Sequence, residues 1–212
     1  MKATTIAILG IIAISFLIGI YLYPQMPERM ASHWGAQGEV NGYASRFVGL
    51  FLMPLISVFI FLLLMAVPKI DPFKKNIEKF KNYYEGFILF IILFLFYIYA
   101  LSLAWNLDYR FNMTTMMTPA LGLLFYYTGA LTENAKRNWF IGIKTPWTLS
   151  SDIVWAKTHK LGGKMFKASG IIALSGIFFP KYAIWFILVP ALFTAVYTFV
   201  YSYVEYKKLK KK

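Results

Sequence analysis

The sequence predicts an all-α integral membrane protein with six transmembrane helices, a structured outer loop and a long inner loop that contains a short interfacial helix. Hydrophobic residues make up 59% of the 212 residues and charged residues only 15%, against roughly 45–50% and about 25% in soluble domains. The apolar residues are gathered into long runs, most of them near the roughly 20 residues that a helix needs to cross a bilayer. The 22 basic residues are distributed unevenly between the loops that join those runs.

Six segments are expected to cross the membrane. The fourth is more polar than the others because it contains four threonines. The fifth is short and carries Lys167 near its start, and we expect this side chain to extend to the interface. We interpret the first run as a retained helix, because it is longer than the 7–15 apolar residues of a signal peptide. In chain order the six spans are Thr4–Tyr23, Phe47–Val67, Gly86–Leu107, Thr114–Leu131, Phe166–Phe179 and Tyr182–Tyr203.

The placement of basic residues agrees with this count of spans. With a cytoplasmic N-terminus, six spans place 18 basic residues on the inner side and 4 on the outer side. Cytoplasmic loops of membrane proteins carry such an excess of lysine and arginine. We therefore expect a multi-pass protein of the plasma membrane with both termini in the cytoplasm. The residues behind the net charge of +13 flank the membrane spans, and we expect the tail Lys207–Lys212 to lie on anionic lipid headgroups. No direct binding of nucleic acid is expected.

The outer loop, Pro24–Arg46, is richer in turn-forming residues than a simple connection requires. Asn41-Gly42 is a strong turn dipeptide, and His33-Trp34 lies near the middle of the loop. Two interpretations remain open. The loop is either a folded cap with Trp34 at the membrane interface or an outward-facing recognition surface.

The inner loop, Glu133–Lys167, also exceeds what a connection needs. Pro146 should end any regular element there. After it we expect a short interfacial helix over Ile153–Lys160, capped by Thr148 or Ser150 and stopped by Gly162-Gly163. The loop holds three of the six tryptophans of the chain, which are Trp139, Trp147 and Trp155.

These two loops resemble known sequence families. The inner segment is similar to the signature of the SdpI-type immunity proteins, with Lys144 at a position where arginine is frequent. Its matching residues are Asn138, Gly142, Ile143, Lys144, Thr145, Pro146, Trp147, Thr148, Leu149, Ser151, Val154, Trp155, Thr158, His159, Gly162 and Gly163. The outer loop resembles the uncharacterised domain that commonly precedes it, although Gly35 replaces a frequent asparagine. Its matching residues are Pro24, Pro27, His33, Trp34, Gly38, Asn41, Gly42 and Ser45.

The resemblance implies two regions, residues 1–85 with two helices and the outer loop, and residues 86–212 with four helices and the inner signature. Characterised members protect a producing cell from a secreted toxic peptide that attacks membranes. They are also proposed to hold a cognate transcriptional repressor at the membrane. The residues expected to bind a ligand or partner are His33, Trp34, Asn41 and Gly42 outside, and Asn138, Gly142, Lys144, Thr145, Pro146, Trp147, Ser151, Trp155 and His159 inside.

Several chemistries are not expected. The chain has no cysteine and two histidines, and because His33 and His159 lie on opposite sides they cannot share a metal ion. His33 with Glu28 and Glu39 would form only a weak metal site. Common catalytic motifs have no suitable context here. We therefore expect no catalysis, cofactor or metal. An unrecognised membrane enzyme remains open as an alternative, behind the transporter considered next.

A small transporter or exporter is the main alternative. Its polar lining would come from the fourth span, although helix packing explains the same residues. They are Thr114, Thr115, Thr118, Tyr126, Tyr127 and Thr128, with Pro119 and Gly122. On the fifth span, small residues recur at Ser169, Ala173 and Gly176, which predicts close approach of a neighbouring helix.

Overall fold

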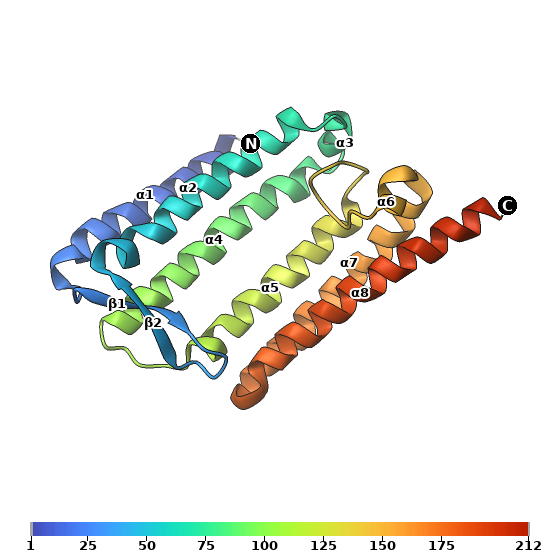
Figure 1. Ribbon diagram of the computed structural model, residues 1–212. Helices are drawn as coiled ribbons and strands as arrows, with labels where there is room; N and C mark the ends of the chain where they lie inside the picture. The colour runs from blue at the N-terminus through green and yellow to red at the C-terminus, as the bar shows by residue number, and fades with distance from the viewer. Residues whose placement is uncertain (1, 212) are drawn as a thin grey trace.

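The computed structural model describes residues 2–211 and, in this part of the chain, consists of six long helices packed side by side (Figure 1). The long helices are α1 (Lys2–Leu22), α2 (Arg46–Ile70), α4 (Lys81–Asn106), α5 (Met113–Asn134), α7 (Asp152–Ser175) and α8 (Ala183–Lys210). The shorter elements are η1 (Tyr23–Gln25), β1 (Arg29–Trp34), β2 (Val40–Ser45), α3 (Lys74–Glu78), α6 (Pro146–Ser150), η2 (Gly176–Phe178) and η3 (Pro180–Tyr182).

Four helices within residues 2–211 are long and apolar enough to cross a membrane, namely α1, α2, α4 and α8 with their adjoining turns. They expose large apolar side chains to their surroundings; for example, Leu17 and Phe59 are each 63% exposed and Phe193 is 61% exposed. This outward apolar surface is unfavourable in water and favourable in lipid. The expected class, a mainly helical membrane protein, is confirmed. The count of six spans stays a prediction, because α5 and α7 are more polar.

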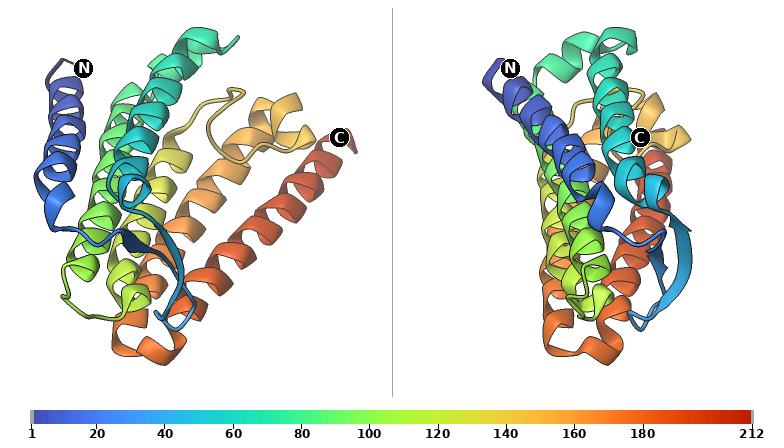
Figure 2. Two further views of the ribbon diagram at one scale, coloured as in Figure 1. Left: turned by 60° about the vertical axis from the view of Figure 1, so that its left-hand side comes forward. Right: turned by 90° about the vertical axis from the view of Figure 1, so that its left-hand side faces the viewer.

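The two ends of the bundle carry different structures. Figures 1 and 2 place the β-hairpin, the α4–α5 connection and the turn between α7 and α8 at one end. The opposite end holds the beginning of α1, the short helix α3, the segment between α5 and α7, and the end of α8. We call these the outer and inner ends. The division into residues 1–85 and 86–212 stays a prediction.

Two buried clusters form the interior. The larger one joins α1, α2, α4 and the inner segments, with Ile8, Ile12, Ile88 and Trp155 among its members. The second cluster lies near the outer end and brings Met26 and Met30 against α2 and α4. The larger cluster joins side chains from Ile8 in α1 to Trp155 in α7, so segments that are distant in the sequence stabilise each other.

The outer loop contains strands that the sequence did not predict. β1 and β2 pair as an antiparallel hairpin with irregular register around His33. The turn lies between Trp34 and Val40, where Gly38 adopts a φ of +86°. The expectation of a turn at Asn41-Gly42 was wrong, because both residues lie in β2. Gly42 is opposite His33, and a Cβ there would lie 2.9 Å from the His33 Cβ; close approach of two strands therefore explains this glycine.

The expected stop at Gly162-Gly163 was also wrong. The helix that begins at Asp152 continues through both glycines to Ser175, so the short interfacial helix and the fifth span are one helix. Both glycines are buried against neighbouring elements: a Cβ on Gly163 would lie 2.7 Å from the Gly129 carbonyl oxygen of α5. Tertiary packing overrides the weak helix propensity of glycine here.

Helices α5 and α7 make the most extensive helix contact of the described chain. Their backbones meet at two levels, Gly129 against Gly163 and Gly122 against Gly170. The Lys167 ammonium also pairs with Glu133 of α5 at 2.5 Å, so this lysine contacts a carboxylate of the neighbouring helix. The predicted close approach along Ser169, Ala173 and Gly176 agrees with their burial.

We predict that Gly170→Ala destabilises the protein by about 1–3 kcal/mol, the usual cost of overpacking. The new Cβ would contact the Gly122 carbonyl oxygen and lie 2.7 Å from the Tyr126 backbone nitrogen, and neither backbone can move without separating the helices. Thermal unfolding in detergent would measure the loss. Gly10→Ala is the matched control, because its Cβ would meet nothing within 4 Å. Equal melting temperatures of the two variants would contradict the packing role of Gly170.

Candidate functional site

The outer hairpin, defined as residues 29–45, is fastened to the end of α4 by one asparagine. The Asn106 side chain accepts a hydrogen bond from the Ala31 N–H at 2.8 Å and donates one to the Ala31 carbonyl at 3.0 Å. An amide side chain has the donor and acceptor needed to continue a strand ladder in this way. Strand β1 is therefore held on its free edge by a helix.

The tip of the outer hairpin is fastened to the beginning of α5. Asn112 donates to the Gln37 carbonyl at 2.6 Å, and Thr114 donates to the Gly35 carbonyl at 3.2 Å. Asn112 also caps α5, because its side-chain oxygen accepts from the Thr115 N–H at 2.9 Å. One residue thus ends the α4–α5 connection, starts α5 and holds the hairpin.

The four predicted outer residues are brought together in the outer hairpin. His33 is exposed, and its Nδ1 contacts the Asn41 side-chain oxygen across the strands. Gly42 lies opposite His33. Trp34 instead points toward the bundle and packs edge-on against Trp105 of α4, with ring centroids 5.8 Å apart. Trp34 therefore anchors the hairpin, and the exposed part of the site is His33 with Asn41.

An exposed pair beside them was missed by sequence reasoning. The Arg29 guanidinium lies 5.7 Å from the centre of the Tyr43 ring, a cation–π distance. Tyr43 is 56% exposed. Alternation along the strands could have pointed to these residues if the strands had been predicted.

At the inner end, residues 135–151 fold into a compact segment that we call the inner cap. Its centre is Asn138, which is fully buried. The side-chain oxygen accepts from the Phe140 and Ile141 N–H groups at 2.9 and 2.6 Å, and the side-chain nitrogen donates to the Lys136 and Ile141 carbonyls at 2.8 and 3.0 Å. All hydrogen-bonding positions of the amide are used, so Asn138 is a scaffold residue of the cap.

Two successive helix caps follow in the inner cap. Thr145 caps α6 in a reciprocal arrangement with Thr148, and its hydroxyl also lies 3.0 Å from that of Ser202 on α8. Pro146 does not end an element but begins α6, as proline suits the first helical position. Ser151 caps α7, which corrects the expectation of Thr148 or Ser150.

The tryptophans of the inner signature serve different purposes. Trp147 is half-buried against α8, with ring centroids 5.1 Å from Phe199 and 5.0 Å from Tyr203. Trp155 is only 2% exposed, and its indole N–H donates to the Ala135 carbonyl at 2.8 Å. Trp155 is therefore part of the core, and only Trp139, 51% exposed, offers a large free face.

His159 closes the inner cap onto α7. Its ring stacks on Trp155 with centroids 3.8 Å apart. Its Nε2 accepts from the Ile143 N–H at 2.9 Å, so Nδ1 carries the proton and donates to the Trp155 carbonyl at 2.9 Å. Gly142, with a φ of +111°, brings the chain over this ring. Burial lowers the pKa of His159 to about 4, although the hydrogen bond to Trp155 acts in the opposite direction.

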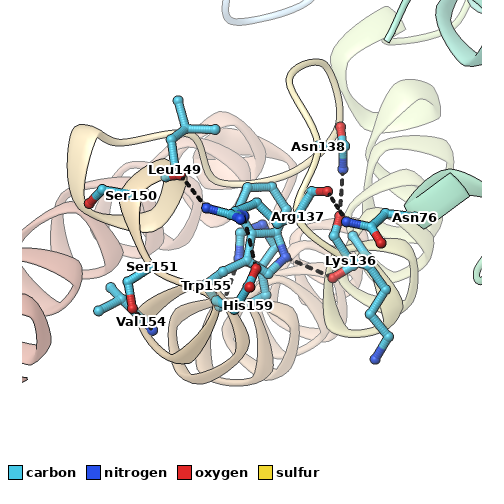
Figure 3. A network of polar contacts seen from close by, with 12 residues as sticks. Asn76, Lys136, Arg137, Asn138, Leu149, Ser150, Ser151, Val154, Trp155 and His159 are labelled. Atoms are coloured by element: carbon cyan, nitrogen blue, oxygen red, sulfur yellow. Dashed lines mark hydrogen bonds and ion pairs between the residues drawn. The ribbon is translucent and has the colours of Figure 1, made fainter. Parts of the chain in front are cut away.

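Three residues that sequence reasoning missed join the inner cap to its neighbours, and two of them, Asn76 and Arg137, are labelled in Figure 3. Buried Asp71 accepts from the Trp139 N–H at 2.9 Å, and Asn76 donates to the Arg137 carbonyl at 2.8 Å. Arg137 donates to the Leu149 carbonyl at 3.0 Å and pairs with Asp152 at 2.8 Å. In the sequence, Asp71 is distinguished only as an acidic residue within a basic loop. Nothing in the sequence distinguishes Asn76 or Arg137.

The two groups of predicted residues therefore form two separate sites at opposite ends of the bundle. At the inner end Lys144 and Pro146 are exposed, whereas Asn138, Thr145, Trp155 and His159 are buried. Most inner signature residues hold the cap together, so a partner could touch only its surface. No group of three or more histidine, aspartate or glutamate side chains among residues 2–211 is arranged to hold a metal ion.

We predict that stability decreases as the pH falls from about 6.5 toward 4, by up to about 3 kcal/mol from His159 alone. In this range the unfolded chain binds a proton that the buried ring does not, because its pKa is lowered to about 4. Thermal unfolding in detergent at several pH values would show a steeper dependence for the wild type than for His159→Gln. His33→Gln is the control and should keep the wild-type slope; an unchanged slope in His159→Gln would exclude His159 as the source.

Comparison with known proteins assigns the chain to a family. Residues 134–202 match the SdpI/YfhL protein family, and residues 10–58 match a domain of unknown function, DUF1648. No solved structure gives a significant match. The chain is 30% identical to the immunity protein SdpI of Bacillus subtilis (strain 168) over 215 aligned positions, which cover 99% of this chain and 98% of that protein. The chain therefore belongs to the SdpI/YfhL family, as the resemblance of its inner signature predicted.

Proposed function

We propose that the protein gives its cell resistance to a secreted toxic peptide that attacks membranes, and that it does so from the plasma membrane without catalysis. The observation that carries this proposal is the similarity to an immunity protein along nearly the whole length of both chains. Such coverage includes the outer hairpin, the helices and the inner cap, so the resemblance extends to both ends of the bundle.

In this proposal α5 and α7 also cross the membrane, which gives six spans with both termini in the cytoplasm. Two observations support it. Both helices lie between α4 and α8 and run alongside them (Figures 1 and 2). Their polar groups are largely paired within the bundle, as the contact of Lys167 with Glu133 illustrates, and pairing reduces the cost of placing such groups in lipid.

The outer hairpin would meet the toxic peptide. Its exposed residues combine a guanidinium, two aromatic rings and an amide, namely Arg29, His33, Asn41 and Tyr43. Aromatic and arginine side chains contribute most of the binding energy in protein interfaces. The hydrogen bonds from Asn106 and Asn112 hold this surface in one position, which reduces the entropy lost on binding.

The inner end would meet a cytoplasmic partner, and a transcriptional repressor is the class that the family resemblance suggests. The surface best placed for this is the tip of the inner cap, where Trp139 and Phe140 are 51% and 42% exposed. Lys136 and Lys144 are exposed beside them. Trp155 is excluded from this surface by its burial.

The fourth predicted span, now α5, does not add support to the transporter alternative. Thr118 is fully buried and donates to the Thr114 carbonyl of its own helix at 2.8 Å. Gly122 packs against Gly170. These residues serve helix packing, which is the simpler of the two interpretations drawn from the sequence.

We predict that single cysteines will report a two-sided topology in this cysteine-free chain. A membrane-impermeant thiol reagent applied to intact cells should label Gln37→Cys at the hairpin tip, because this end faces outward. Ser150→Cys and Lys210→Cys should be labelled only after the cells are opened. Labelling of Ser150→Cys in intact cells would contradict the assignment of the inner cap to the cytoplasm.

We predict that the protein restores survival to Bacillus subtilis strain 168 lacking its own SdpI when that strain is exposed to medium conditioned by the parent strain. The double variant His33→Ala, Tyr43→Ala should lower survival by about tenfold or more, because it removes exposed rings from the proposed contact surface. Colony counts give survival, and immunoblots of membranes give abundance.

The matched control is Phe59→Ala, which removes an aromatic ring that is 63% exposed on the side of α2. It should leave survival unchanged. Failure of the wild-type chain to protect at normal abundance would contradict immunity against this peptide mixture. Protection by the double variant at wild-type level would remove the outer hairpin from the proposed contact.

A further inference from the structure

A polar cavity of about 490 Å³ lies at the inner end, between α3, the beginning of the inner cap and the first turns of α7. Such a volume is in the range of small-molecule binding sites. Trp155 and His159 contribute to its wall, and their stacked rings are fixed by the hydrogen bonds described above. The cavity thus has a rigid base formed by α7.

The charges around this cavity do not balance. Its lining includes two carboxylates, and both are already engaged: Glu133 pairs with Lys167 at 2.5 Å, and Asp152 pairs with Arg137 at 2.8 Å. Three further cations line it, namely Lys79, Lys136 and Lys160. None of these three ammonium groups has a carboxylate partner within residues 2–211.

The three lysines come from three different elements. Lys79 follows α3, Lys136 lies at the start of the inner cap and Lys160 belongs to α7. The hydrogen bond from Asn76 to the Arg137 carbonyl at 2.8 Å joins the first two elements, and the hydrogen bond from Trp155 to the Ala135 carbonyl joins the last two. The folded structure therefore holds three like charges around one cavity, an arrangement that an anion would stabilise.

The position of the cavity favours a lipid as the source of that anion. Its lining extends along α7 from Asp152 to Lys160, about 12 Å toward the outer end, and reaches Glu133 within the last turn of α5. In the six-span arrangement proposed above, on which this step rests, these levels are the ends of the spans, where headgroup phosphates lie. Basic pockets between helices on the cytoplasmic side of membrane proteins are known to bind anionic headgroups.

We propose that this cavity is a binding site for the headgroup of an anionic phospholipid, with its phosphate among Lys79, Lys136 and Lys160. Arg137 is left out of the proposed phosphate ligands because Asp152 neutralises its charge and the Leu149 carbonyl accepts from its Nη1. A bound headgroup would neutralise the lysines and would join α3, the inner cap and α7. The site is independent of any toxin, so its test is separate from the test of resistance.

The experiment uses the full chain purified in neutral detergent. Thermal unfolding is followed with added phosphatidylglycerol, phosphatidylcholine or inorganic phosphate at matched ionic strength, and native mass spectrometry counts retained lipid. Phosphatidylglycerol should raise the melting temperature in a concentration-dependent way, whereas phosphatidylcholine should not. The triple variant Lys79→Gln, Lys136→Gln, Lys160→Gln should bind phosphatidylglycerol at least about tenfold more weakly than the wild type.

The matched control is Lys207→Gln, Lys210→Gln, Lys211→Gln, which removes the same charge from the end of the chain outside the cavity. Equal losses of binding in both variants would overturn the proposal in favour of diffuse attraction to the surface. Equal stabilisation by inorganic phosphate at the same concentration would identify a soluble anion instead. Hexaglutamate is tested as a fourth addition, and stabilisation by it without any effect of phosphatidylglycerol would assign the cavity to an acidic protein segment. Because native mass spectrometry of the wild type compares two lipids directly, the proposal is testable even if the cavity variant fails to fold.

Discussion

The close approach of α5 and α7 is the constraint on which the inner end of the molecule depends. Their backbones meet at Gly129 with Gly163 and at Gly122 with Gly170, where no side chain would fit. Once these helices are in contact, the end of α5 and the beginning of α7 are fixed relative to each other. The residues between them must then fold within a short distance, and a segment so confined has to satisfy its backbone groups locally.

The inner cap meets that requirement almost entirely with side chains. Asn138 bonds four backbone groups of three nearby residues, Thr145 and Ser151 cap consecutive helices, and His159 accepts from the Ile143 N–H. This explains why so many polar residues of the signature are buried. Histidine and asparagine are residue types that suit a binding site. In the inner cap their side chains instead form the hydrogen bonds that the backbone of a helix or strand would have formed.

Much of the fold could be predicted from the long apolar runs and from the charges between them. The features that depend on contacts between distant segments could not be predicted. An apolar run is a property of consecutive residues, so the runs indicated the long helices, although the fifth run, Phe166–Phe179, covers only the later part of α7. The course of α7 through Gly162-Gly163 was misjudged, since both glycines are explained by distant contacts. Gly163 packs against Gly129, which lies 34 residues earlier, and Gly162 packs against Ile143 and Thr198. The outer hairpin was missed because its strands are short and are held by Asn106 and Asn112, which come much later in the chain. The inner signature predicted residues for a binding site at this end, but it did not predict that Trp155 and His159 would be buried.

Helix α5 connects the two ends of the molecule as a single stiff element. Its first turn is bonded to the tip of the outer hairpin through Asn112 and Thr114, and its last turn continues directly into the inner cap. A helix of 22 residues is about 33 Å long and changes length very little. We therefore expect a displacement of the hairpin tip along the axis of α5 to be transmitted to the inner cap. The fold therefore joins the outer hairpin to the inner cap through one helix.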